Sequence, residues 1–190
     1  MVVDESVNAE AFTVEVGLAR LLLGNFIDVR ARDLERQLGF GMAAVEAAPS
    51  TYQQLRGAVE RSQDTGAALP VSSLFCADSI YLSPVVNQRF RFWHDVSHVQ
   101  RGLSFELPDE MELALWHLDE LVAAGFEPDS MAYRMFEADL VGQLLLMGLI
   151  GRFPLRQWDF VLDALRFGLH AALLEEVRRV PATAPGPVSA

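Results

Sequence analysis

The stretch NQRFRFWHDVSHVQRG, residues 87–102, indicates the fold of this chain most clearly. Apolar residues, among them Phe90 and Trp93, surround a compact polar group that contains two histidines. Gly102 follows the last residue of the pattern, and glycine commonly ends a helix because it tolerates the left-handed conformation. We therefore predict a helix over residues 87–101 that is apolar except for one polar cluster.

The same kinds of signal predict further helices on both sides of this stretch. Pro108 suits the first position of a helix, and Asp109 and Glu110 would lie in its first turn, where the helix dipole favours negative charge. Ser50 is a candidate N-cap, with Gln53 completing a capping box. Helical spacing of apolar residues predicts helices at 11–23, 33–48, 51–61, 108–124, 131–150 and 154–180.

No segment alternates between apolar and polar residues as a half-buried strand would. Residues 67–87 carry Pro70 and Pro84 and are expected to form a loop with at most a short helix. The fold class predicted is therefore all-α. We expect a single-domain bundle of six or seven helices over residues 1–180, followed by a disordered tail at 181–190.

The composition excludes several classes of partner and location. With a formal net charge of -11, the chain would repel nucleic acid, so no nucleic-acid partner is expected. The longest apolar run, residues 144–150, is far shorter than the roughly 20 residues that span a bilayer. Cys76 is the only cysteine, so no intrachain disulfide can form, and a cytoplasmic location is the default expectation.

The polar cluster of the predicted 87–101 helix has the spacing of a metal site. His94 and His98 are four residues apart and lie one turn above each other, while Asp95 falls on the same arc of about 100°. Glu110 arrives from the next helix after a short loop. Two imidazoles with carboxylates suit a divalent metal, zinc first, with iron, cobalt and manganese as alternatives. We predict that these four side chains bind one ion.

The alternative to a metal is a polar stripe on which Asp95 is a solvated neighbour of the histidines. Phe92 and Trp93 favour the metal, because a polar cluster on an apolar helix is costly to bury unless it is paired or metal-bound. The motif remains a hypothesis about a site until its structural context is known.

The string H-D-x-x-H, eleven residues and then E resembles the signature of the fourth Coq protein family, the small helical proteins of ubiquinone (coenzyme Q) biosynthesis. His94, Asp95, His98 and Glu110 match its metal-binding positions, and Arg91 resembles an arginine just upstream of the motif. The resemblance implies an all-helical fold, a divalent metal, a groove for a polyprenylated aromatic and a role in removing a ring carboxylate. Residues 87–125 carry it, and a different aromatic or polyketide-like substrate is also plausible.

Several other side chains are candidates for roles near the metal. His117 lies seven residues after Glu110 and could be a general acid/base, a partner of a ligand or a core residue. Arg91 could hold a substrate carboxylate, as arginine forks do. Glu137 is expected to face a cavity and Asp139 to be solvated, although periodicity decides neither. The residues expected to border an apolar cavity are Phe92, Trp93, Leu113 and Leu145.

Three functions remain open from the sequence. The first is a metal-dependent enzyme, decarboxylase-like or of related ring chemistry, acting on a small aromatic substrate that is prenylated or polyketide-like. The second is a scaffold without catalysis that binds a lipid or small molecule and keeps the metal as a structural element. The third is a helical interaction module without metal. An apolar aromatic small molecule is the expected partner, with a homodimer and a contact with a membrane surface or multienzyme assembly left open.

Overall fold

The computed structural model describes residues 5–179, and the tail expected at 181–190 lies outside these residues. The described part is mainly helical and contains one pair of short strands. In chain order its elements are α1 (Glu5–Leu38), β1 (Met42–Val45), α2 (Tyr52–Thr65), β2 (Leu69–Ser72), α3 (Pro84–Arg101), α4 (Leu107–Ala123), α5 (Met131–Glu137), the π-helix η1 (Ala138–Gly142), α6 (Gln143–Ile150), α7 (Gln157–Phe167) and α8 (Leu169–Arg178). Because α5, η1 and α6 form one continuous helix, the described residues contain seven helices, and the predicted all-α bundle is confirmed.

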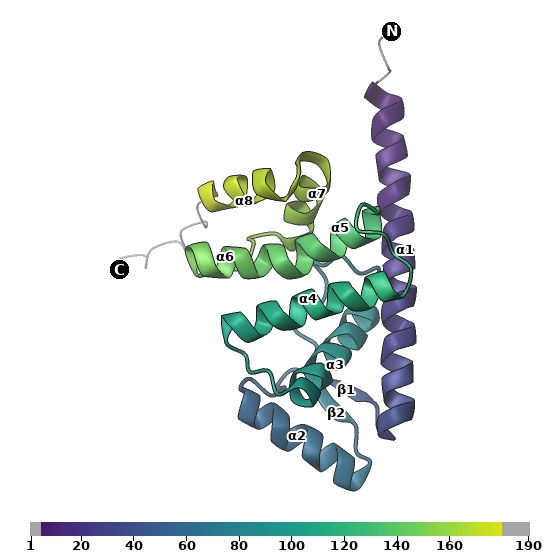
Figure 1. Ribbon diagram of the computed structural model, residues 1–190, viewed down its shortest axis with the longest axis vertical. Helices are drawn as coiled ribbons and strands as arrows, with labels where there is room; N and C mark the ends of the chain where they lie inside the picture. Colours follow the sequence, from purple (N-terminus) through teal and green to yellow (C-terminus); the bar gives the residue numbers. More distant parts are fainter. Residues whose placement is uncertain (1–4, 180–190) are drawn as a thin grey trace, which may run out of the picture.

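Helix α1 forms the long edge of the molecule, and the other helices stack along one side of it (Figure 1). The sequence predicted two helices, 11–23 and 33–48, and this division is wrong. In α1 the buried residues Val16, Leu23 and Ala31 form one helical stripe that runs through the segment between the two predicted helices. The helix therefore continues without interruption to Leu38.

Strands β1 and β2 correct the expectation that the chain contains no strand. They pair in parallel, with Met42 opposite Leu69, and α2 connects them. The sequence predicts a helix that includes residues 42–45 and a loop that includes residues 69–72. Each strand has only four residues, and such short segments are too brief for alternation to be distinguished from a helical pattern.

The start of α2 lies one residue later than the sequence suggested. Thr51, and not Ser50, is the N-cap, and its hydroxyl accepts a hydrogen bond from the amide of Gln54. The Gln54 side chain in turn accepts a hydrogen bond from the Ser50 amide. The predicted capping box is therefore present only in part, because the Gln54 side chain bonds the amide of the residue before the N-cap and not that of the N-cap itself.

The predicted helix at 154–180 is two helices, α7 and α8. Gly168 separates them with φ 88° and ψ 153°, a conformation that only glycine adopts readily. Together α7 and α8 pack against α6 and η1 and complete the bundle (Figure 1). None of the helices in the described part of the chain is long and apolar enough to cross a membrane.

Candidate metal centre and its cavity

Helices α3 and α4 bring the predicted ligands together. α3 begins after Ser83, whose hydroxyl accepts from the Val86 amide, and ends at Gly102 with φ 71°. This fixes the length of the helix that carries His94 and His98. After a short loop, α4 starts at Leu107 and carries Glu110 in its first turn.

The loop between α3 and α4 is held by Asp109. Its carboxylate accepts hydrogen bonds from both the amide and the hydroxyl of Ser104, the first at 2.8 Å. These bonds lower the pKa of Asp109. The aspartate therefore fixes the turn that presents Glu110.

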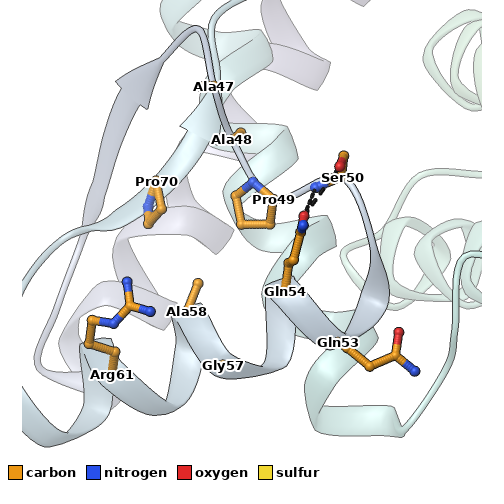
Figure 2. A pocket seen from close by; sticks show the side chains of 10 residues that line it. All are labelled: Ala47, Ala48, Pro49, Ser50, Gln53, Gln54, Gly57, Ala58, Arg61 and Pro70. Atoms are coloured by element: carbon orange, nitrogen blue, oxygen red, sulfur yellow. Dashed lines mark hydrogen bonds between the residues drawn. The ribbon is translucent and has the colours of Figure 1, made fainter.

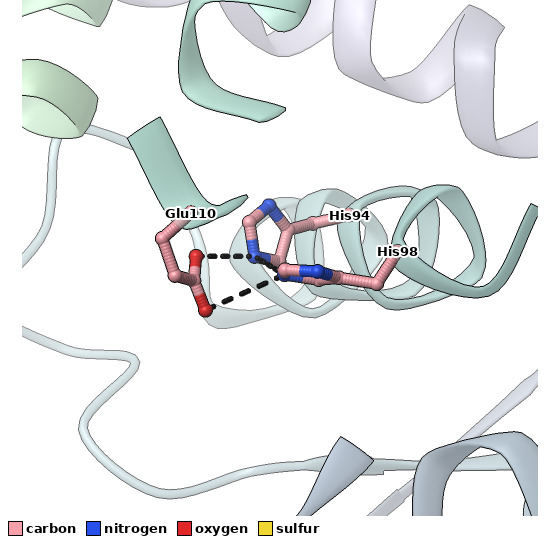
Figure 3. A group of neighbouring side chains, drawn as sticks. All are labelled: His94, His98 and Glu110. Atoms are coloured by element: carbon pink, nitrogen blue, oxygen red, sulfur yellow. Dashed lines mark hydrogen bonds and ion pairs between the residues drawn. The ribbon is translucent and has the colours of Figure 1, made fainter. Parts of the chain in front are cut away.

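His94, His98 and Glu110 converge on one point (Figure 3). Each residue offers one ligand atom, and the three atoms lie within 4.8 Å of one another. The Nε2 atoms of the two histidines are 3.0 Å apart. The Glu110 carboxylate lies 3.5 Å from His94 Nε2 and 3.4 Å from His98 Nε2. This group could hold a metal ion, as the sequence predicted for these three residues.

The hydrogen bonds on the far side of each imidazole favour this use. His98 Nδ1 lies 3.1 Å from the carbonyl oxygen of Leu103, so it carries the proton and Nε2 presents a lone pair. His94 Nδ1 lies 3.2 Å from His117 Nε2, and donation from His94 likewise leaves its Nε2 unprotonated. Three electron-pair donors then face one another, an arrangement that a shared cation stabilises.

Glu110 has the electrostatic character of a ligand. Burial by itself would raise the pKa of its carboxyl group, but when no metal is bound and the imidazoles carry protons, hydrogen bonds and charge from His94 and His98 outweigh that effect and lower the pKa to about 2. The carboxylate is therefore ionised at neutral pH, as a metal ligand must be.

Asp95 is not in the three-residue group. It lies near enough for His94, His98 and Arg91 to act on its carboxyl group. Burial nevertheless raises the pKa of Asp95 to about 6, because the positive charges compensate only in part. Three of the four predicted ligands, His94, His98 and Glu110, thus lie together, and Asp95 lies beside them.

His117 lies behind His94 and away from the cavity wall. It is fully buried, and its ring centroid is 4.1 Å from that of Trp93. Burial, followed by the nearby His94 and His98, lowers its pKa well below 6.5, so the ring is neutral. Its Nδ1 is buried without a hydrogen-bond partner among the described residues. Of the roles considered from the sequence, this position matches a partner that orients His94.

A cavity of about 1020 Å³ reaches the candidate metal site. His94 and Glu110 are part of its wall, and so is Arg91, whose Nη1 donates to the Ser72 carbonyl at 3.0 Å. Phe75 also lines the cavity while remaining 87% exposed, which places it at the opening to solvent. The apolar part of the wall is formed by Phe75, Phe90, Phe105, Leu107, Leu140, Leu144, Met147, Phe153 and Leu155.

The sequence predicted a cavity at this place but named the wrong residues for its wall. Phe92, Trp93 and Leu113 are buried in the core, and Leu145 is also absent from the wall. Neighbouring residues line the cavity instead, since a shift of one position turns a helical side chain by about 100°.

Glu137 and Asp139 have the opposite roles to those expected. Asp139 is 3% exposed and lines the cavity, whereas Glu137 is not part of its wall. Asp139 follows the buried residues Ala132, Met135 and Phe136 at spacings of seven, four and three positions, so it lies on the buried face of this helix.

A second hollow, of about 650 Å³, lies beside α2 (Figure 2). Small residues such as Ala48, Gly57 and Ala58 line much of it, and Arg61 is its only charged residue. It contains no carboxylate, histidine or cysteine, so it lacks the groups that metal binding or acid–base chemistry requires.

Neither a comparison with models of known protein families nor comparisons with curated proteins and with solved structures found a match. The functional argument therefore depends on the site itself.

Proposed function

We propose that this chain is a metal-dependent enzyme that acts on a small aromatic molecule, by decarboxylation or related ring chemistry. The observation that carries the proposal is that the three-residue group His94, His98 and Glu110 borders a largely apolar cavity of about 1020 Å³. Zinc is the metal that this nitrogen and oxygen set suits best, with iron, cobalt and manganese as alternatives.

The number of ligands favours an enzyme over a scaffold with a structural metal. Structural zinc sites are usually closed by four protein ligands, whereas catalytic sites use three and keep one position open for water or substrate. Here three side chains form the group, and two of them, His94 and Glu110, belong to the cavity wall. An open position would therefore face the space where a substrate can bind.

Arg91 supplies the positive charge that an acidic substrate needs. It lines the cavity next to His94, and a guanidinium binds a carboxylate through paired hydrogen bonds. A metal bound at the site would polarise a substrate oxygen as a Lewis acid. In a decarboxylation the bond between ring carbon and carboxylate breaks, carbon dioxide leaves, and the electron pair stays on the ring carbon, which takes up a proton.

The apolar wall indicates the rest of the substrate. Side chains such as Leu144, Met147 and Phe153 would accommodate an alkyl or prenyl substituent on the ring. The spacing shared with the fourth Coq family suggests the same kind of molecule, a ring carboxylic acid with an apolar chain. Such a ligand matches both the charged and the apolar parts of the cavity.

The first test is the metal content of protein purified without added metal, measured by elemental analysis. We expect about one divalent ion per chain in the wild type and none in His98→Ala. The matched control is His170→Ala, which removes an exposed histidine of α8. Equal metal content in all three proteins would contradict the site.

The second test separates an enzyme from a scaffold. Release of carbon dioxide from hydroxybenzoic acids that carry an alkyl chain is measured together with the melting temperature. For a catalytic metal, His98→Ala abolishes turnover while the fold persists. For a structural metal the same substitution lowers the melting temperature sharply, because the free energy of metal binding is then part of the free energy of folding.

A further inference from the structure

A second polar group lies in the same cavity and is formed by residues outside the metal site. Asp139, in η1, is 3% exposed and accepts hydrogen bonds at Oδ1 from the side-chain amides of Gln143, at 2.9 Å, and Gln157. Its Oδ2 has no hydrogen bond to any described residue. All three side chains belong to the cavity wall. The carboxyl group is thus oriented by two amides and keeps one oxygen free for a ligand.

Tyr81 is the second member of this group. It is 4% exposed and lines the cavity, and its hydroxyl oxygen is buried without a hydrogen-bond partner among the described residues. Burial raises its pKa well above 10, and the charge of Asp139 adds to the effect. Asp139 is therefore near the phenol although no hydrogen bond joins the two. A buried hydroxyl without a protein partner is uncommon, and such a group can bond to a ligand.

The surrounding structure holds both residues in place. Arg20 of α1 donates hydrogen bonds to the carbonyl oxygens of Ile80, at 2.8 Å, and Tyr81, at 2.7 Å. Asp78 accepts from the backbone amides of Gln157 and Trp158 at the start of α7. The loop that carries Tyr81 and the helix that carries Gln157 are thereby fixed to each other, as a preorganised binding site requires.

We propose that Tyr81 and Asp139 form a second subsite of the cavity, which binds a hydroxyl group of an aromatic ligand. The inference rests on the proposed function in so far as the same cavity holds the substrate. A hydroxyl group can donate to Asp139 Oδ2 and accept from the Tyr81 phenol at the same time, which satisfies both unpartnered atoms. An ether oxygen can only accept, and a second carboxylate would be repelled by Asp139 when that residue is ionised.

Phe90 lies next to a member of each polar group. The Phe90 ring packs on both Tyr81 and His94, with centroid separations of 5.5 Å in each pair. Tyr81 of the subsite and the candidate ligand His94 therefore both contact Phe90. A ring with oxygen substituents at two positions could contact both, while an apolar substituent follows the aliphatic wall.

The test compares 4-octylphenol with 4-octylanisole, which differ only in the replacement of the hydroxyl hydrogen by a methyl group. Binding is measured by calorimetry on protein kept metal-free with a chelator, so that the phenol cannot bind a metal. We expect the wild type to prefer the phenol by about tenfold, the size of one or two net hydrogen bonds. Failure of the metal site would leave this ratio unchanged, so the two proposals are tested separately.

Two conservative variants and one control complete the experiment. Tyr81→Phe and Asp139→Asn should each reduce the preference for the phenol to about threefold or less, with circular dichroism verifying that each variant is folded. Leu144→Ala, which alters the apolar wall, should weaken both probes and leave their ratio unchanged. Equal binding of the two probes by the wild type, or an unchanged ratio in both polar variants, would overturn the subsite, as would the binding of neither probe.

Discussion

At the scale of single residues, burial of Asp139 makes the stability of the fold depend on pH. Desolvation is the main cause that raises the pKa of its carboxyl group from 3.8 to about 6, against the hydrogen bonds from Gln157 and Gln143. A carboxyl group with a raised pKa stabilises the folded state most when it is protonated. Its contribution is complete below about pH 4 and is lost as the pH rises through about 6.

Asp139→Asn should therefore remove the loss of stability that ionisation of Asp139 causes as the pH rises. From pH 4 to pH 7 the free energy of unfolding of the wild type should fall relative to that of the variant by on the order of 3 kcal/mol. Tyr81, the titratable neighbour, stays neutral over this range because its pKa is raised. Urea denaturation of both proteins at several pH values measures the difference. If the difference in free energy of unfolding between the two proteins does not change with pH, Asp139 titrates as an exposed aspartate does.

His117 can be tested as a residue that positions His94. Replacing it with alanine removes the Nε2 atom that lies 3.2 Å from His94 Nδ1, so the imidazole loses its orienting partner. We expect His117→Ala to weaken metal binding by 10- to 100-fold, the usual cost of losing such a partner. Competition with a chelator gives the affinity, and His170→Ala is the control. Full affinity with a rate loss of about 10²-fold would favour a general acid/base instead.

The convergence of the candidate metal ligands could be predicted from the sequence because the information is local. The four-residue spacing of His94 and His98 already places both rings on one side of a helix. Glu110 follows after a short loop and lies in the first turn of the next helix, so it stays near the end of the helix that carries the histidines. Tyr81 and Asp139 could not be found in this way, since 58 positions separate them and only the folded chain makes them neighbours.

At the scale of elements, Gly142 allows η1 and α7 to pack closely. A Cβ atom at this position would lie 2.8 Å from Cε1 of Phe160 and 3.1 Å from Cδ1 of Leu169. Both are buried or partly buried in the core, so neither can move aside easily. The close approach also brings the first turn of α7 near Asp139, where Gln157 donates its hydrogen bond.

Gly142→Ala should destabilise the fold by about 1–3 kcal/mol, the usual cost of overpacking a core. Gly57→Ala is the matched control, since Gly57 is also helical and its added Cβ would meet nothing within 4 Å. That control should be neutral or stabilising by roughly 0.5–1 kcal/mol. Denaturant unfolding of both variants compares them. A tolerated Gly142→Ala would show that α7 can move away from η1.

Several helix boundaries were predictable at this scale from local end signals, whereas the strands and the π-helix were not. Pro108, Ser130 and Gly151 mark real helix boundaries because caps depend on local backbone chemistry. The pairing of β1 with β2 depends on residues far apart in the chain, and η1 has no recognised sequence signal. The single helix α1 contains the predicted 11–23 helix and only the first part of the predicted 33–48 helix, and its continuity reflects burial against α3 and α5, which outweighs local propensity.

At the scale of the whole molecule, the cavity wall is assembled from distant parts of the chain. Buried Glu176 of α8 pairs with Arg152, at 2.6 Å, and accepts from the amide of Leu155. Arg152 also donates to the carbonyl oxygens of Glu176 and Arg179. This network fixes residues 152–155, which contribute Phe153 and Leu155 to the wall. The cavity therefore requires the C-terminal helices as much as α3.

The contact between Asp78 and α7 has a consequence for the order of folding. Its carboxylate bonds two amides that are 79 and 80 positions later in the chain, so the loop that links them is long and costly to close. Such a contact is expected to form after the folding transition state. Asp78→Ala removes a helix cap worth about 1 kcal/mol, which should raise the unfolding rate about fivefold and leave the refolding rate nearly unchanged. Stopped-flow unfolding and refolding measure both rates. If the refolding rate instead falls about fivefold and the unfolding rate does not change, the contact is already formed in the folding transition state.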